Sequence, residues 1–259
     1  RHRTVRVPCP ALARPLRILH LSDSHLMRHD RAKMAFIRRM TALDYDFVLF
    51  TGDVTETVEA EHLVPSLLSR QPTYGAYVVF GNHDHLRMPR QWMLREMLTQ
   101  RFYGQGTQSD PLAMKANFEA EGKWQVLINE ARAHDVDGKR VVVVGVDDPY
   151  TGAGDLQIAM RHVKQADVLI GLVHVPTNLA SFAQRGFHLV LSGHTHGGQI
   201  RIPLYGAMVT QCDLPRQHAA GLHQVERTAV HVSQGLGAGK LVRLRFNCPP
   251  TAYTILLGG

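Results

Sequence analysis

Five short segments of the chain each place Asp, Asn or His directly after an apolar run that is typical of a buried strand. In two of them, LHLSDSH and SGHTHGG, the polar residues are two positions apart. Side chains at i and i+2 of an extended chain share a face, so each such pair can reach one metal ion. The residues at these positions are Asp23, His25, Asp53, Asn82, His174, His194 and His196.

Taken singly, these residues have ordinary explanations. A Gly-Asp pair such as the one ending in Asp53 is usually a turn, and a lone His after a strand is usually a surface residue. Taken together, they lie at the carboxyl ends of expected parallel strands, which is where α/β sheets bind ligands. The combination therefore favours a binding site over a set of unrelated turns.

The types of side chain in this set indicate which ions it would bind. Two carboxylates, one amide and four imidazoles, without a thiolate, suit Mn²⁺, Fe²⁺, Zn²⁺ or Co²⁺ better than a structural zinc. Seven ligands exceed the needs of one ion, so we expect two ions that share a bridging carboxylate. Two ions about 3.5–4 Å apart are the usual machinery of phosphate-ester hydrolysis.

The elements that must position these residues alternate in the manner of an α/β protein. The expected strands are 17–22, 47–50, 76–80, 140–146, 168–173 and 188–193, and the expected helices are 30–42, 56–69, 88–99, 155–165 and 177–185. The last part differs, because 229–233, 241–246 and 252–257 read as strands joined by Gly/Pro turns. We therefore expect a second, more antiparallel sheet packed on the first, within one domain over 16–259.

Two segments stand apart from this alternation. Residues 1–15 are basic and contain three prolines, which predicts an N-terminal arm that is either a linker or an edge strand. The chain starts at Arg1, so we expect an upstream piece. Residues 86–123 are longer than one helix requires and rich in Met and aromatic residues, which predicts either a lid over the site or part of the core. Asp110-Pro111 should start a helix there.

Composition excludes several classes of protein. Of 259 residues, 44% are hydrophobic and 20% are charged, which rules out disorder, collagen and coiled coil. No apolar run approaches the roughly 18 residues of a membrane-spanning helix. Three cysteines are too few for a disulfide scaffold, and without a C-x-x-C they indicate neither a zinc knuckle nor a thioredoxin-type site. The net charge of +7 favours anionic partners, while aromatic residues at 7% without regular basic neighbours argue against nucleic acid.

In this order, Asp-x-His, Gly-Asp, Gly-Asn-His-Asp, a lone His and Gly-His-Thr-His resemble the signature of calcineurin-like metallophosphoesterases. The resemblance spans about residues 17–257. GHTHGGQIRIPLYGA (193–207) and SQGLGAGKLVRLRFNCPP (233–250) are similar to the membrane-associated bacterial subfamily that includes a UDP-2,3-diacylglucosamine pyrophosphatase. The resemblance implies an α/β fold, a four-layer α-β-β-α sandwich in which helices flank two mixed β-sheets.

The resemblance also implies a role for each site residue. One ion would be held by Asp23, His25, Asp53 and His196, and the other by Asp53, Asn82, His174 and His194. His83 would contact the phosphate and protonate the leaving oxygen, and Asp84 would orient the loop or a ligand histidine. One departure is Glu56, which stands where many relatives have Asp three positions after the bridging residue. Its longer side chain puts a role in orienting His83 in doubt.

These observations predict a hydrolase with two divalent metal ions, among which Mn²⁺ is the first candidate and Fe, Zn, Co or Mg are alternatives. The expected substrate is a phosphodiester or pyrophosphate, with a UDP-diacylglucosamine-like lipid nucleotide as the first choice. A soluble nucleotide or other phosphorylated small molecule is the alternative, followed by a nuclease and a non-catalytic scaffold. The subfamily and the basic arm predict a protein of the bacterial inner membrane surface, in peripheral contact with it, or of the cytoplasm.

Overall fold

The computed structural model describes residues 1–87, 95, 106–203, 205–208, 210, 212, 214–238 and 244–259. The first large sheet has the strand order β1-β16-β2-β3-β4-β7. Its centre is parallel and consists of β2 (Leu16–Leu21), β3 (Phe47–Thr51) and β4 (Gly75–Val79), with β7 (Gln125–Val126) parallel to β4. On the other side, β16 (Ala252–Leu257) runs antiparallel to β2.

The second large sheet has the order β14-β15-β11-β10-β9-β8. Four parallel strands form its centre: β9 (Lys139–Gly145), β10 (Val168–Leu172), β11 (Leu189–Ser192) and β15 (Thr228–Val232). The antiparallel strands β14 (Gly221–Val225) and β8 (Glu130–Val136) form its two edges.

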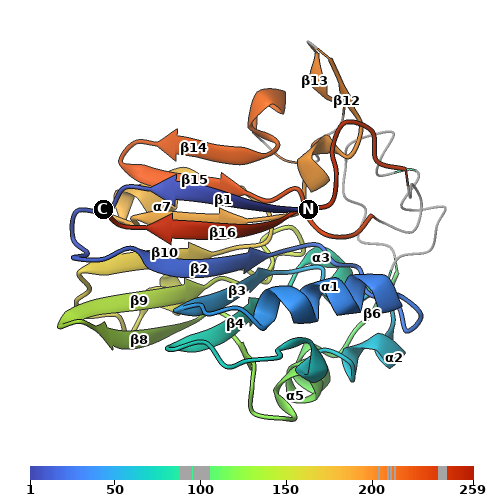
Figure 1. Cartoon of the computed structure of the whole chain (residues 1–259), viewed down its shortest axis with the longest axis horizontal. Coiled ribbons are helices and arrows are strands. Elements are labelled where there is room, and N and C mark those ends of the chain that lie inside the picture. Colours follow the sequence, from blue (N-terminus) through green and yellow to red (C-terminus); the bar gives the residue numbers. More distant parts are fainter. Residues whose placement is uncertain are drawn as a thin grey trace.

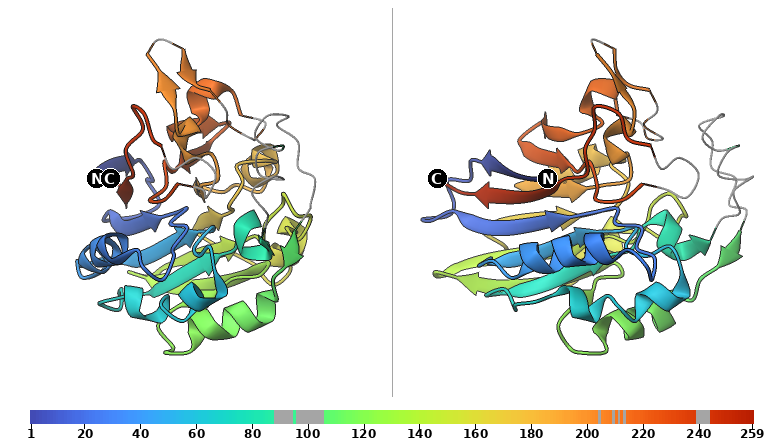
Figure 2. Two further views of the ribbon diagram at one scale, coloured as in Figure 1. Left: turned by 90° about the vertical axis from the view of Figure 1, so that its right-hand side faces the viewer. Right: turned by 45° about the vertical axis from the view of Figure 1, so that its right-hand side comes forward.

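Three buried clusters define four layers, which confirms the predicted α-β-β-α sandwich (Figure 1). Between the sheets, side chains such as Leu49 of β3 pack with Ile170 of β10. The outer face of the first sheet packs against α1 (Arg31–Thr41) and α5 (Pro111–Glu119), as Figure 2 also shows. The outer face of the second sheet packs against α6 (Leu156–Met160) and α7 (Leu179–Gln184).

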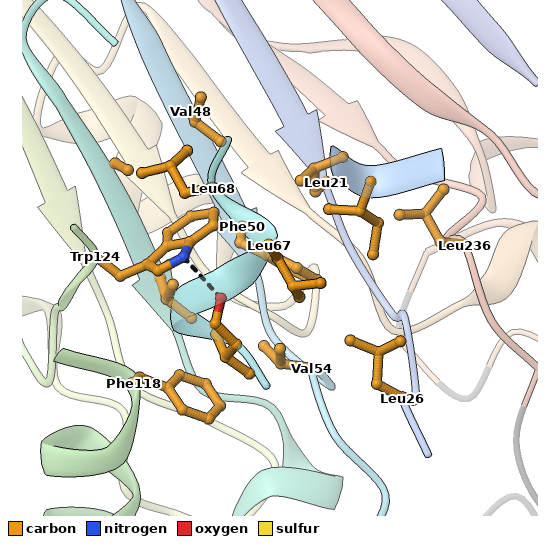
Figure 3. Close-up of a cluster of buried hydrophobic side chains, with 14 of the residues drawn as sticks. Leu21, Leu26, Val48, Phe50, Val54, Leu67, Leu68, Phe118, Trp124 and Leu236 are labelled. Atoms are coloured by element: carbon orange, nitrogen blue, oxygen red, sulfur yellow. Dashed lines mark hydrogen bonds between the residues drawn. The ribbon is translucent and has the colours of Figure 1, made fainter. Parts of the chain in front are cut away.

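Among the described residues, the largest fully buried side chain is Trp124, which lies in the cluster under α1 and α5 (Figure 3). Its indole Nε1 donates a hydrogen bond to the carbonyl of Val64 at 3.1 Å, so this polar group is satisfied inside the core. The helix predicted to start at Asp110-Pro111 is confirmed, and the Asp110 side chain accepts from the amides of Leu112 and Ala113.

Several predicted elements are wrong or differ in extent. The helix expected at 56–69 is broken into α2 (Val58–Glu61) and a 3₁₀ turn (Pro65–Leu67). Pro65 has no amide hydrogen to donate to the preceding turn, so the helix does not continue through it. The last strands do not form a sheet of their own, since β15 joins the second sheet and β16 the first. Residues 244–246 form no strand beyond a single bridge of Phe246 to Ile200.

The two segments that stood apart in the sequence have different outcomes. Residues 2–7 form β1 (His2–Val7), an edge strand parallel to β16. In 86–123, β5 (Leu86–Arg87) pairs with β6 (Thr107–Gln108). The expected helix 88–99, apart from residue 95, and part of the proposed lid, residues 88–94 and 96–105, lie outside the described residues. Among the helices of the described part, none is long and apolar enough to cross a membrane.

The remaining elements are short and lie in the connections between strands. α3 (Asn82–His85) follows β4, a 3₁₀ turn (His196–Gly198) follows β11, and another 3₁₀ turn (Arg216–His218) precedes β14. A hairpin of β12 (Arg201–Ile202) and β13 (Gly206–Ala207) projects from the body of the protein at the top of Figure 1.

Candidate metal centre

The seven predicted ligand residues come from loops at the carboxyl ends of five parallel strands. Three of these strands, β2, β3 and β4, belong to the first sheet, and β10 and β11 belong to the second. The site therefore joins the edges of the two sheets. All seven residues are buried except the half-buried His196.

The backbone of these loops is strained. Positive φ angles occur at Asp23 (48°), His25 (42°), Asp53 (51°), His194 (67°) and His196 (49°). Such a conformation costs a residue with a side chain about 1–3 kcal/mol, and it persists where surrounding contacts enforce it. Here the amides of Asp23 and His25 donate to the carbonyls of Gly52 and Asp53 at 3.0 and 2.9 Å. Strain gathered in this way is typical of a functional site.

Four of the side chains converge in the arrangement expected for one ion. Oxygen and nitrogen atoms of Asp23, His25, Asp53 and His196 all lie within 4.8 Å of one another. Nε2 of His25 is 3.0 Å from Nε2 of His196 and 3.5 Å from Oδ2 of Asp53. Nε2 of His196 is 3.6 Å from Oδ1 of Asp23. Two imidazole nitrogens and two carboxylates that face one point suit a divalent cation.

The second predicted set is brought together in two close pairs, His174 with Asp53 and His194 with Asn82. Nε2 of His174 is 3.3 Å from Oδ2 of Asp53, and Nδ1 of His194 is 3.1 Å from Oδ1 of Asn82. His174 Nδ1 donates to the carbonyl of Thr51 at 2.7 Å, so Nε2 is the nitrogen that would face a metal ion. Within the described residues, this buried Nε2 has no hydrogen-bond partner. An unpartnered imidazole nitrogen beside a carboxylate fits a metal ligand.

The charges of the cluster are strongly coupled. Burial alone would raise the pKa of Asp53, but the imidazoles of His174, His83 and His25 outweigh it and hold that pKa well below its usual range. Burial opposes a charged His174, yet the Asp53 carboxylate raises the pKa of His174 to about 10. Buried carboxylates are stabilised by positive charge close to them, and bound divalent ions would supply that charge.

The loops can approach this closely because Gly81 precedes Asn82. A Cβ atom on Gly81 would lie 2.3 Å from Oδ1 of Asp53 and 2.7 Å from Cδ2 of His174. Any larger residue would therefore displace the shared carboxylate. The amide of His83 donates to the same Oδ1 at 2.9 Å, which holds Asp53 toward the α3 loop.

Two carboxylates that the sequence singled out support the loops. Asp84 accepts from the amides of Val54 and Gly81 at 3.1 and 3.0 Å, and so ties the β3 and β4 loops together. Oε1 of Glu56 is 2.6 Å from Nδ1 of His25 and 3.6 Å from Nδ1 of His83. Its closer partner is thus the ligand histidine, which fixes the Nδ1 proton of His25 and turns Nε2 toward the site.

Other residues near the centre carry no sequence signal that singled them out. Arg245 places Nη2 3.0 Å from Nδ1 of His196. The ring of Tyr150 lies 5.1 Å from that of His194. Asp148, in the same loop as Tyr150, is fully buried. Nε2 of His85 lies 2.7 Å from Oδ1 of Asp147, the residue before Asp148.

With this geometry in hand, the family follows from comparison with known proteins. Residues 16–198 match the family model of the calcineurin-like phosphoesterases. The chain belongs to this family. It is therefore an enzyme of the kind that hydrolyses phosphoester bonds with divalent metal ions, and the resemblance inferred from the five motifs is confirmed.

The relatives of this calcineurin-like phosphoesterase include a metallophosphoesterase, a phosphodiesterase and a pyrophosphatase, according to their names. The chain is 27% identical to the uncharacterized metallophosphoesterase YkuE of Bacillus subtilis, over 92% of this chain and 78% of the relative. It is 26% identical to the phosphodiesterase YaeI of Escherichia coli, over 92% and 80%. It is also 26% identical to the UDP-2,3-diacylglucosamine pyrophosphatase LpxG of Chlamydia muridarum, over 91% and 81%.

Proposed function

We propose that the protein hydrolyses a phosphodiester or pyrophosphate bond at a centre of two metal ions that share Asp53. The observation that carries this proposal is the position of Asp53 between two ligand sets, with Oδ2 3.5 Å from Nε2 of His25 and 3.3 Å from Nε2 of His174. Two ions at such a centre would make water nucleophilic at neutral pH and neutralise charge on the phosphate. Mn²⁺ is the ion we propose first.

His83 is the residue we propose to contact the phosphate and to supply the proton for the leaving oxygen. Its side chain is 16% exposed, so it reaches the open side of the centre. Burial lowers the pKa of His83, whereas the carboxylates of Asp53 and Glu56 oppose this effect. Histidine is the side chain that most often transfers a proton in catalysis, and the two neighbouring carboxylates favour the protonated form of His83.

For the substrate we propose a lipid nucleotide similar to UDP-diacylglucosamine. Large apolar side chains are exposed along the β12–β13 hairpin and the segment that bridges to it, namely Ile202, Tyr205, Met208, Leu244 and Phe246. Phe246 is joined to the loop after His196, because its amide donates to the carbonyl of Gln199 at 3.0 Å. This apolar surface would therefore begin beside one metal ligand set, and each buried acyl CH₂ contributes about 0.8 kcal/mol to binding.

The name of the LpxG relative supports the same substrate class. The same apolar surface supports the expected peripheral contact with a membrane, because a substrate with acyl chains is held in a bilayer. The alternative substrate is a soluble phosphodiester, which the name of the YaeI relative favours.

The experiment is a hydrolysis panel with protein loaded with Mn²⁺, Zn²⁺, Fe²⁺, Co²⁺ or Mg²⁺. Its substrates are UDP-diacylglucosamine, bis-p-nitrophenyl phosphate, p-nitrophenyl phosphate and single-stranded DNA. We expect metal-dependent turnover of the first two and none in Asp53→Ala. Activity on neither diester nor pyrophosphate would refute the proposed chemistry.

A pair of variants tests the lipid substrate separately. Phe246 is 55% exposed on the apolar surface, and Leu112 is 72% exposed on α5, which lies at the side of the molecule opposite the β12–β13 hairpin in Figure 1. We expect Phe246→Ser to raise KM for UDP-diacylglucosamine and to leave bis-p-nitrophenyl phosphate turnover unchanged. Leu112→Ser is the control and should change neither. Equal effects of Phe246→Ser on both substrates would leave the soluble diester as the better substrate class.

A further inference from the structure

A chain of buried polar side chains leads from the space between the two sheets to the ligand Asp23. It begins at His231 on β15, crosses to His20 on β2, and continues through Thr51 and Ser22. The contacts are His231 Nδ1 to His20 Nδ1 (3.0 Å), His20 Nε2 to Thr51 Oγ1 (2.9 Å), Thr51 Oγ1 to Ser22 Oγ (2.8 Å) and Ser22 Oγ to Asp23 Oδ2 (2.5 Å). All five residues have a relative exposure of 0%.

The carboxylate at the end of this chain fixes the direction of every hydrogen bond in it. The Ser22 hydroxyl donates to Oδ2 of Asp23 at 2.5 Å, which is closer than the Thr51 carbonyl at 3.1 Å. The Thr51 hydroxyl then donates to Ser22, and Nε2–H of His20 donates to Thr51. His20 is left with a lone pair on Nδ1, which accepts from Nδ1–H of His231.

Two independent observations agree with this assignment. Burial lowers the pKa of His20 well below its usual range and that of His231 to about 3, so each ring is neutral and carries one proton. The assignment leaves a bare lone pair on Nε2 of His231. This buried nitrogen is one of the few side-chain atoms of the described residues that have no hydrogen-bond partner. The chain thus has a defined end.

We propose that His231, His20, Thr51 and Ser22 form a positioning relay that sets the affinity of the metal ion held by Asp23. The proposal rests on the metal centre proposed above. By donating to Oδ2, Ser22 holds the carboxylate so that Oδ1 faces His196, with 3.6 Å between Oδ1 and Nε2. A row of donors that all point the same way is mutually strengthening, and groups that orient metal ligands commonly change metal affinity about 10–100-fold.

The Gly-His-Thr-His motif makes room for this relay. A Cβ atom on Gly193 would lie 1.9 Å from Ser22 Oγ and 2.4 Å from Asp23 Oδ2. The amide of the next residue, His194, donates to Asp23 Oδ1 at 2.9 Å. The glycine therefore allows the Ser22 hydroxyl and the His194 amide to bind the same carboxylate from two sides.

The first test measures binding of Mn²⁺ to chelator-treated protein by calorimetric titration. Wild type should bind two ions. Ser22→Ala and the isosteric Thr51→Val should weaken one of them about 10–100-fold and leave the other unchanged. Thr51→Ser keeps the hydroxyl and should therefore bind both ions with wild-type affinity.

Ser24→Ala is the matched control, because Ser24 is also buried beside Asp23 but donates to the carbonyl of Val54 at 2.6 Å. It should leave both affinities unchanged. Wild-type affinities in Ser22→Ala and Thr51→Val, or an equal loss in Ser24→Ala, would overturn the proposal.

The second test reads the proton positions directly and needs neither metal nor activity. Long-range ¹H–¹⁵N spectra of histidine-labelled, chelator-treated wild type should show His20 protonated at Nε2 and His231 protonated at Nδ1. The opposite tautomer of either ring, or a charged ring near pH 7, would overturn the relay. If wild type binds no Mn²⁺, the proposed metal centre fails, and these spectra still decide whether the relay exists.

Discussion

Asp148 offers a quantitative test of the electrostatics around His174. It lies in the loop after β9 with a relative exposure of 0%, and its Oδ2 accepts from the amide of Thr151 at 2.8 Å. Its Oδ1 has no hydrogen-bond partner among the described residues. Burial is the main reason that the pKa of Asp148 rises from 3.8 to about 6, and the His174 imidazole acts against it.

The size and sign of the effect follow from this shift. A rise of about 2 pKa units corresponds to about 3 kcal/mol, because each unit is worth about 1.4 kcal/mol. The folded state holds the proton more tightly than the unfolded chain. The contribution of Asp148 to the free energy of unfolding is therefore fully present below pH 3.8 and is lost as the pH rises through about 6.

Asp148→Asn removes this titration and keeps an oxygen for the Thr151 amide. Urea unfolding of chelator-treated wild type and variant at several values between pH 4 and pH 7.5 measures the difference. The free energy of unfolding of the variant, relative to wild type, should increase by about 2.5 kcal/mol across this range, because part of the effect already lies below pH 4. Burying an amide in place of the Asp148 carboxyl shifts the difference in unfolding free energy by the same amount at every pH, so it does not change the dependence on pH. A difference that is constant with pH would refute the reasoning.

Three further predictions concern the centre and the core. Asp53→Ala should lose both metal ions and nearly all activity, and retention of two ions per chain by elemental analysis would contradict the shared carboxylate. His83→Ala should keep the ions and lose about 10²–10⁴-fold in rate, whereas a metal-free variant would make His83 a ligand. Trp124→Ala should lower the free energy of unfolding by about 3–5 kcal/mol in urea titrations, because a fully buried indole leaves a cavity; a loss below about 1 kcal/mol would contradict its place in the core.

The predicted elements that the structure confirms are those with strong local signals. The β-branched run 140–146 is β9, and the Asp110-Pro111 cap starts α5. The helix expected at 56–69 failed for a local reason, the proline within it, whereas the wrong assignment of the last strands depended on distant partners. Residues 229–233 and 252–257 read alike in the sequence, but one pairs with β11 and the other with β2. Sheet membership is decided by which apolar face each strand buries, and a local pattern does not contain that information.

The sequence by itself determined the ligand types, their order and their place after apolar strands, because metal chemistry restricts the side chains and a strand end restricts their spacing. Only the tertiary structure decided how these ligands are supported. Glu56 proved to be closer to His25 than to His83, by 2.6 Å against 3.6 Å. His20 meets a partner 211 residues away across the two sheets. Such contacts arise from the packing of one buried layer on another, and a buried histidine has no spacing rule that reveals it beforehand.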